Sequence, residues 1–157
     1  MKEVAGMEKR FVADAMLGKL SKWLRVLGYD AHHQSFYPGD LLDRLAQEGR
    51  TLLSRRPQTV EKHLHALLIR SDRLTEQIQE VREKSGITAP RSKWFTRCLR
   101  CNVRLRKATT EKTRENVPEY VFHENAGEIR FCPSCGRFFW PGTHRVRMEK
   151  QLEQWGF

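Results

Sequence analysis

Four cysteines in two matched pairs are the residues of this sequence whose types and spacing most directly specify chemistry. They form the motifs Cys-Leu-Arg-Cys and Cys-Pro-Ser-Cys and comprise Cys98, Cys101, Cys132 and Cys135. A Cys-x-x-Cys turn places two sulfurs on one side of a tight loop, and two such turns complete the tetrahedral shell that Zn²⁺ prefers. Four thiolates leave no open coordination position, so the pattern predicts a structural zinc ion. A redox pair needs only one such motif, so the second pair argues against thiol–disulfide chemistry.

Aromatic side chains around the second cysteine pair admit two interpretations. They are Phe131, Phe138, Phe139 and Trp140. Packing into the small core of a zinc module is the common role of such residues, and stacking on RNA bases is the functional alternative. His144 follows closely, but four cysteines already fill a zinc shell. We therefore expect His144 to lie on the surface or behind the ligands.

A second set of candidate groups consists of aspartates near the ends of predicted strands. Asp14 ends a short apolar run, Asp40 starts a predicted helix, and Asp72 follows another apolar run. Ligands of open α/β sheets bind beyond the carboxyl ends of the strands, so these carboxylates could converge there, with Asp43 one helical turn after Asp40. Clustered carboxylates bind Mg²⁺ or Mn²⁺, which can activate water and stabilise a phosphodiester transition state.

Helix capping is the ordinary interpretation of the same aspartates. Asp14, Asp40 and Asp72 each precede a predicted helix, where an aspartate usually accepts hydrogen bonds from free backbone amides. The two roles are compatible, because a capping carboxylate can also bind a metal. The pattern alone therefore makes a metal-dependent nuclease one hypothesis among several.

Apolar periodicity predicts the frame that would position these groups. Short apolar runs predict strands at 10–14, 51–54 and 66–69, and residues 29–32 are predicted to form a short second strand. Helical spacing predicts helices at 15–27, between Asp40 and Gly49, at 58–64, and from a cap at Ser71 or Asp72 through Val81. Strands that alternate with helices indicate a parallel α/β sheet with both faces covered.

Two domains follow from the change in pattern along the chain. We predict an α/β domain at 10–84, a linker rich in Gly, Pro and Ser at 85–93, and a zinc ribbon at 94–157. The ribbon should contain short β-like runs and a final helix near 145–154.

The formal net charge of +10 favours a polyanionic partner, most often nucleic acid. The excess is concentrated in the ribbon, and in the α/β domain Lys19, Lys22 and Arg25 recur along one predicted helix. A solvated helix face and a phosphate-contacting stripe are the two interpretations of these residues. A zinc-dependent protein-interaction module that binds no RNA is a further alternative.

No apolar run approaches the length of a membrane helix, and the first residues lack the apolar core of a signal peptide. We therefore expect a cytoplasmic protein with no membrane partner. A reducing compartment also favours metal-bound thiolates over disulfides.

Several segments, spread in order along the chain, together carry a family resemblance. They are residues 11–30, 40–50, 68–72, 77–81, 97–102, 132–136 and 140–144. Together they resemble the Mut-seven C-terminal RNase domain family over nearly the whole chain after residue 9. The resemblance implies a PIN-like, three-layer α/β domain fused to a zinc ribbon. It also implies cleavage of RNA with acidic residues and Mg²⁺ or Mn²⁺, with Asp14 as the first-strand acid and Asp40 at the acidic helix start.

One segment departs from the family pattern. The family usually has a Thr-Arg-Asp type segment after the third strand, whereas this chain has Ser54, Arg55 and Arg56. A cation in place of an acid should weaken the binding of a divalent ion. The leading hypothesis is a metal-dependent endoribonuclease. The alternative is a catalytically impaired PIN-like protein that binds RNA, with the ribosome and tRNA among its candidate partners, where Arg55 and Arg56 contact phosphates.

Overall fold

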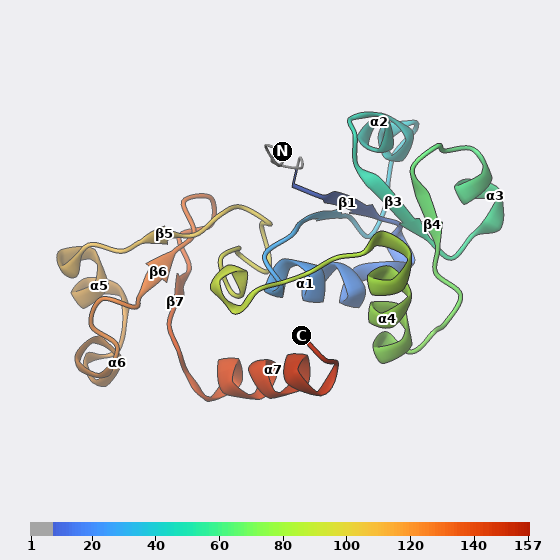
Figure 1. The fold of residues 1–157 in the computed structure, drawn as a ribbon. Helices are drawn as coiled ribbons and strands as arrows, with labels where there is room; N and C mark the ends of the chain where they lie inside the picture. The colour runs from blue at the N-terminus through green and yellow to red at the C-terminus, as the bar shows by residue number, and fades with distance from the viewer. Residues whose placement is uncertain (1–7) are drawn as a thin grey trace, which may run out of the picture. The chain divides into compact units, whose positions relative to one another are not determined.

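The computed structural model of the protein describes residues 8–157, which form two compact units. The first unit ends at Phe95 and the second covers Thr96–Phe157 (Figure 1). The segment 85–93, expected as a linker, lies within the first unit. Its Thr88 carbonyl accepts a hydrogen bond from the Tyr29 hydroxyl, and its Ala89 carbonyl accepts one from Trp94 Nε1 at 2.9 Å.

Four parallel strands form the sheet of the first unit, in the order β2-β1-β3-β4. The strands are β1 (Arg10–Ala13), β2 (Asp30–His33), β3 (Thr51–Ser54) and β4 (Ala66–Leu68). The helices between and after them are η1 (Ala15–Leu17), α1 (Gly18–Val26), α2 (Leu41–Gln47), α3 (Pro57–Glu61), α4 (Leu74–Ser85) and η2 (Arg91–Lys93). The predicted parallel α/β architecture is confirmed.

Helices cover both faces of this sheet, which explains its continuous apolar strands. On one face, Val12 of β1 and Leu52 of β3 pack in a cluster with Ala46 of α2. Figure 1 shows α1 and α4 together on the other side of the sheet. The side chains of Leu20 and Leu24 in α1 are fully buried. The layers therefore hold the central strands β1 and β3 rigidly between helices.

The strand order places a topological switch point between β1 and β3. The chain leaves β1 through α1 to reach the edge strand β2, and it leaves β3 through α3 to reach β4 at the opposite edge. Connections that diverge from two adjacent parallel strands leave a crevice at their carboxyl ends, where α/β proteins bind ligands. The residues that end β1 and β3 are therefore the first candidates for a site.

The second unit is built on a small antiparallel sheet with the order β5-β6-β7. Its elements are β5 (Arg106–Lys107), α5 (Thr110–Asn116), α6 (Glu119–Glu124), β6 (Arg130–Phe131), β7 (Phe138–Phe139) and α7 (Thr143–Gln154). The final helix was predicted, whereas α5 and α6, inserted between the cysteine pairs, were not. The Thr109 side chain starts α5 by accepting a hydrogen bond from the Lys112 amide at 3.3 Å.

The inserted helices supply a small core for this unit. Val117, Val121 and Ile129 form a buried cluster, against which Phe138 and Trp140 pack. These two aromatic residues therefore pack in the small core of the module, as one of the two interpretations expects.

Candidate functional site

The four cysteines come together as the two matched motifs predict. All four sulfur atoms lie within 4.8 Å of one another, and Cys98 Sγ lies 3.8 Å from Cys135 Sγ. Zinc–sulfur bonds of about 2.3 Å in a tetrahedron separate the sulfurs by about 3.8 Å. Within residues 8–157 this is the one group of three or more His, Cys, Asp or Glu side chains gathered so closely. The donor set therefore fits a metal ion such as zinc.

The two Cys-x-x-Cys turns are closed by the same pair of backbone hydrogen bonds. In each turn, the amide and the carbonyl of the first cysteine both form hydrogen bonds with the two residues that follow the second cysteine. The residue directly after the second cysteine has a positive φ, 63° at Asn102 and 75° at Gly136, a conformation that asparagine and glycine tolerate best. The bonds are Cys98 N to Val103 O (2.9 Å), Asn102 N to Cys98 O (2.8 Å), Cys132 N to Arg137 O (2.9 Å) and Gly136 N to Cys132 O (2.9 Å).

Backbone amides also point at the sulfur atoms. The Cys101 amide donates to Cys98 Sγ at 3.4 Å, and the Cys135 amide donates to Cys132 Sγ at 3.5 Å. Burial raises the pKa of the Cys98 thiol to about 12, whereas the backbone amide of Arg137 lowers the pKa of Cys135 to about 7. A buried thiol with a high pKa becomes a thiolate only beside a cation. The four gathered sulfur atoms, with backbone amides that point at two of them, have the form of a ligand shell.

Asp14 lies at the switch point of the parallel sheet, directly after β1. Its side chain is nearly buried, with 5% of the residue exposed. One carboxylate oxygen accepts a hydrogen bond from the Ala15 amide at 2.7 Å, as predicted for a helix cap. The other accepts one from the Ser54 hydroxyl at 2.8 Å, at the end of β3. Asp14 is therefore fixed in one orientation by the two central strands.

Ser54 connects Asp14 to the segment that departs from the family pattern. Its hydroxyl oxygen accepts a hydrogen bond from the Arg56 amide at 3.1 Å while its hydrogen is donated to Asp14. The side chain of Arg56 is exposed at the start of α3. Arg55 is partly buried, and its Nε has no hydrogen-bond partner among residues 8–157. Sequence reasoning singled out these arginines but missed Ser54 as the partner of Asp14.

The loop after β2 also reaches the end of β1. The Tyr37 hydroxyl donates to the Ala13 carbonyl at 2.7 Å and accepts from the Gln34 amide at 3.1 Å. Burial raises the pKa of Tyr37 to about 12, and the charge of Asp14 acts in the same direction. Sequence reasoning gave no role to Tyr37. Its only signal in the sequence is an aromatic residue with a polar tip directly before the predicted turn.

The other predicted carboxylates are not gathered around Asp14. Asp40 is exposed and lies 3.2 Å from Arg44 Nε, and its side chain makes no capping hydrogen bond. Asp43 bonds to His63 Nε2 at 2.9 Å. Asp72 is exposed and precedes the capping residue of α4, so the prediction that its side chain caps α4 is wrong. Of the four aspartates, Asp14 alone belongs to the hydrogen-bonded network at the ends of β1 and β3.

Residues of α4 instead hold the segment that contains Asp72. The Glu80 carboxylate accepts hydrogen bonds from the Arg70 amide at 2.9 Å and the Ser71 amide at 2.8 Å. The buried Gln77 side chain donates to the Ser71 carbonyl at 2.9 Å. Sequence reasoning missed both roles, although Gln77 and Glu80 alternate with the apolar positions of this helix.

The proposed basic stripe on α1 is only partly exposed. Lys19 and Lys22 are exposed, whereas Arg25 is buried and its Nε donates to the Ala31 carbonyl at 2.8 Å. The expectation that Arg25 shares an exposed face with the two lysines is therefore wrong. The long apolar stem of an arginine packs readily in an interior where its head finds a carbonyl.

Comparison with known families places the chain in a family. The family model described as the Mut7-C RNAse domain matches residues 9–152, nearly the whole chain. No curated protein and no solved structure matches the chain. No helix in the described part of the chain has the length and apolar character needed to cross a membrane.

Proposed function

Because this chain belongs to the Mut7-C RNAse domain family, we propose that it is a ribonuclease that hydrolyses RNA phosphodiesters where β1 and β3 end. The observation that carries the proposal is the buried Asp14 carboxylate, oriented from two strands at the switch point of the sheet. Each of its two carboxylate oxygens accepts one hydrogen bond from the protein. A carboxylate oxygen has a further lone pair, so Asp14 can still receive a cation or a proton.

Asp14 offers one buried carboxylate to a magnesium or manganese ion at this edge. Such ions are commonly held by one or two carboxylates, several waters and the substrate's own phosphate. Asp14 would be the buried ligand; Asp40, Asp43 and Asp72, the other acids expected from the sequence, do not join it in one ligand group among residues 8–157. When bound, the ion would supply Lewis acidity toward the phosphodiester. Asp14 then orients the reacting groups, and Ser54 keeps its side chain in one rotamer.

Positive charge near this edge would hold the RNA backbone. Lys19 and Lys22 are exposed on α1, which begins soon after Asp14, and Arg56 is exposed at the start of α3. Lysine and arginine contacts to phosphates position a strand without reading its sequence. We propose that these side chains, with Arg55, bind RNA, and that the cysteine cluster holds a structural zinc ion. The ribosome and tRNA are candidate partners.

The test is cleavage of end-labelled RNA by the zinc-loaded protein with Mg²⁺ or Mn²⁺, and with EDTA. The decisive variant is Asp14→Asn. Asparagine is nearly the same size and can still accept a hydrogen bond from Ala15, so the fold should persist. We expect metal-dependent cleavage to fall by at least about a hundredfold. Unchanged cleavage by a folded Asp14→Asn protein would rule out this active site.

A second candidate function is RNA binding without cleavage, and a specific observation favours it. Arg56 stands where the family has an acid, and Asp40 and Asp43 are each paired with a basic side chain. In that case neither the wild type nor Asp14→Asn would cut RNA with any divalent ion. Both would bind it with an affinity that falls steeply as salt rises, because phosphate contacts release counterions.

A further inference from the structure

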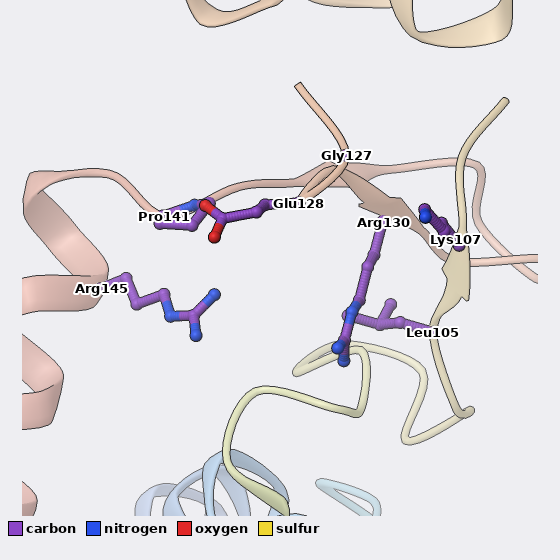
Figure 2. A pocket seen from close by; sticks show the side chains of 7 residues that line it. All are labelled: Leu105, Lys107, Gly127, Glu128, Arg130, Pro141 and Arg145. Atoms are coloured by element: carbon purple, nitrogen blue, oxygen red, sulfur yellow. The ribbon is translucent and has the colours of Figure 1, made fainter. Parts of the chain in front are cut away.

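A cavity of about 510 Å³ opens in the second unit. Three basic side chains line it, those of Lys107, Arg130 and Arg145, together with one acid, Glu128. Figure 2 shows the Arg130 and Arg145 side chains reaching toward the open space from opposite sides. The volume lies in the range typical of small-molecule sites, so it has room for a nucleotide rather than only an ion.

Two of these cations face one another across adjacent strands. Lys107 of β5 and Arg130 of β6 are directly opposed in the antiparallel register, and both are exposed. Like charges directly opposite in a sheet are destabilising. Within residues 8–157, neither side chain makes a hydrogen bond or ion pair. The sheet therefore holds two uncompensated positive charges together, an arrangement that a bound anion would stabilise.

The same row of the sheet continues to an aromatic ring. Arg130 is paired in register with Phe139 of β7, so Lys107, Arg130 and Phe139 lie on one face. The opposite face carries Phe131 and Phe138, whose rings lie 6.1 Å apart. Phe139 is half-buried. Phe139 does not line the cavity but lies next to Arg130 in this row. A phosphate over the two cations would therefore have an aromatic ring beside it, on which an RNA base can stack.

The acid in the cavity distinguishes among anions. Glu128 extends into the same open space as Arg145 (Figure 2). The Nε of Arg145 donates a hydrogen bond to Glu149 at 3.2 Å. A carboxylate repels an isolated phosphate but accepts a hydrogen bond from a hydroxyl. The ribose 2′-hydroxyl of RNA is such a donor, and DNA lacks it. Cations, an aromatic ring and an acceptor together match the three parts of a ribonucleotide.

We propose that this cavity binds one nucleotide of a single-stranded RNA. Lys107 and Arg130 bind a backbone phosphate, Phe139 stacks on a base, and Glu128 accepts a hydrogen bond from the ribose 2′-hydroxyl. The proposal deepens the function proposed above, and it rests on that function only in taking RNA as the ligand. Binding is therefore measured in the Asp14→Asn background, where the result does not depend on cleavage.

The experiment measures fluorescence anisotropy of a labelled oligouridylate with the zinc-loaded full chain. The double variant Lys107→Gln with Arg130→Gln is compared with Arg147→Gln and Lys150→Gln. These two control residues are exposed on α7, outside the cavity, and give the same change in net charge. We expect the cavity variant to bind at least tenfold more weakly, and the control less than about threefold. The slope of log affinity against log salt concentration should become shallower by about 0.7, as expected when contact with one single-strand phosphate is lost.

Equal weakening of both double variants would overturn the proposal, because general charge attraction would then explain the binding. Thermal unfolding provides the check on structure. Since the substitutions remove a like-charge pair, the midpoint should stay the same or rise. A lower midpoint with unchanged RNA affinity would assign these side chains a structural role and also overturn the site.

Two further arms test the nature of the ligand. A deoxyoligonucleotide of matching sequence should bind more weakly than the RNA, and Glu128→Ala should abolish this difference by weakening RNA alone. Equal binding of RNA and DNA by the starting protein would overturn the role of Glu128. Uridine monophosphate, supplied at the same phosphate concentration, should compete poorly with the RNA. Strong competition would indicate that the cavity binds a free nucleotide rather than an RNA strand, and it would overturn the proposal.

Discussion

The cysteine cluster takes its four ligands from two short turns, whereas the Asp14 site takes its groups from three strands and the segments that follow them. Each cysteine turn is closed by hydrogen bonds between residues a few positions apart. Asp14 instead depends on Ser54, which lies 40 positions away in the sequence. Local bonds shape each turn, and the short pairing of β5 with β6 connects the segments that carry the two turns. A bound ion would join the sulfur atoms themselves. In the first unit, by contrast, the packing of the sheet itself holds Asp14 in position without a metal ion.

This difference predicts that the two sites respond oppositely to loss of metal. A strong chelator at neutral pH should unfold the second unit around the cysteines, because binding of structural zinc contributes about 10–16 kcal/mol in small modules. The first unit should stay folded, because its core is an apolar sheet covered by helices. Amide hydrogen exchange read by mass spectrometry checks both parts in one experiment. Protection should vanish near the cysteines and persist in β1 and β3.

Cys98→Ser should reproduce the effect of the chelator without any added reagent. Serine is a poor zinc ligand of similar size, so the substitution isolates coordination from packing. Retained protection around Cys132 in this variant would show that the second unit is stable without a filled shell. The contrast between the two sites would then be broken.

A second prediction tests the long-range contact on which the Asp14 site depends. Ser54→Ala removes a buried hydroxyl that donates to Asp14 and accepts from the Arg56 amide. The buried Asp14 carboxylate and the Arg56 amide would each lose a partner, so the free energy of unfolding of the first unit should fall by about 1–3 kcal/mol. Urea denaturation followed by tryptophan fluorescence measures this change. The affinity of the cysteine cluster for zinc should not change.

Ser92→Ala is the matched control, since Ser92 is exposed in η2. An exposed substitution of this kind should change stability by no more than about 0.5 kcal/mol. If Ser54→Ala behaved like the control, the hydroxyl would not be needed to hold Asp14, and the sheet edge would be less firmly built than its geometry indicates.

The same contrast explains which features could be predicted from the sequence. The cysteine cluster follows from spacing alone, because each turn is a local structure, and Asn102 and Gly136 even carry its signature. The position of Asp14 could be predicted because a short apolar run and a following helix are also local signals. The Ser54 contact could not, since it depends on which strands become neighbours, and strand order is not a local property.

The sequence also could not predict which charged side chains are exposed and which are buried or paired. Periodicity grouped Arg25 with Lys19 and Lys22, but the neighbouring strand β2 offers Arg25 a carbonyl that keeps it buried. The aspartates failed to converge for a similar reason. Asp43 pairs with His63, a residue just after α3 whose position depends on how α2 and α3 are placed, whereas Asp40 pairs with Arg44 one turn along the same helix. Charge pairs between different helices cannot be predicted by examining one segment of the sequence at a time.

The smallest expected effect concerns Tyr37, which ties the loop after β2 to the end of β1. An ordinary tyrosine has a pKa near 10, and burial raises that of Tyr37 to about 12. The unfolded chain therefore loses this proton first, so the stabilisation is complete below about pH 10 and is lost as the pH rises toward 12. Allowing for partial exposure, the loss should be about 1 kcal/mol.

Urea denaturation at a series of pH values would measure this loss of stability, and Tyr37→Phe should flatten this part of the curve. Tyr120→Phe, at a position 65% exposed, should keep the wild-type slope. Equal slopes in all three proteins would mean that Tyr37 ionises freely, and that the loop beside Asp14 opens more readily than the sheet that holds it.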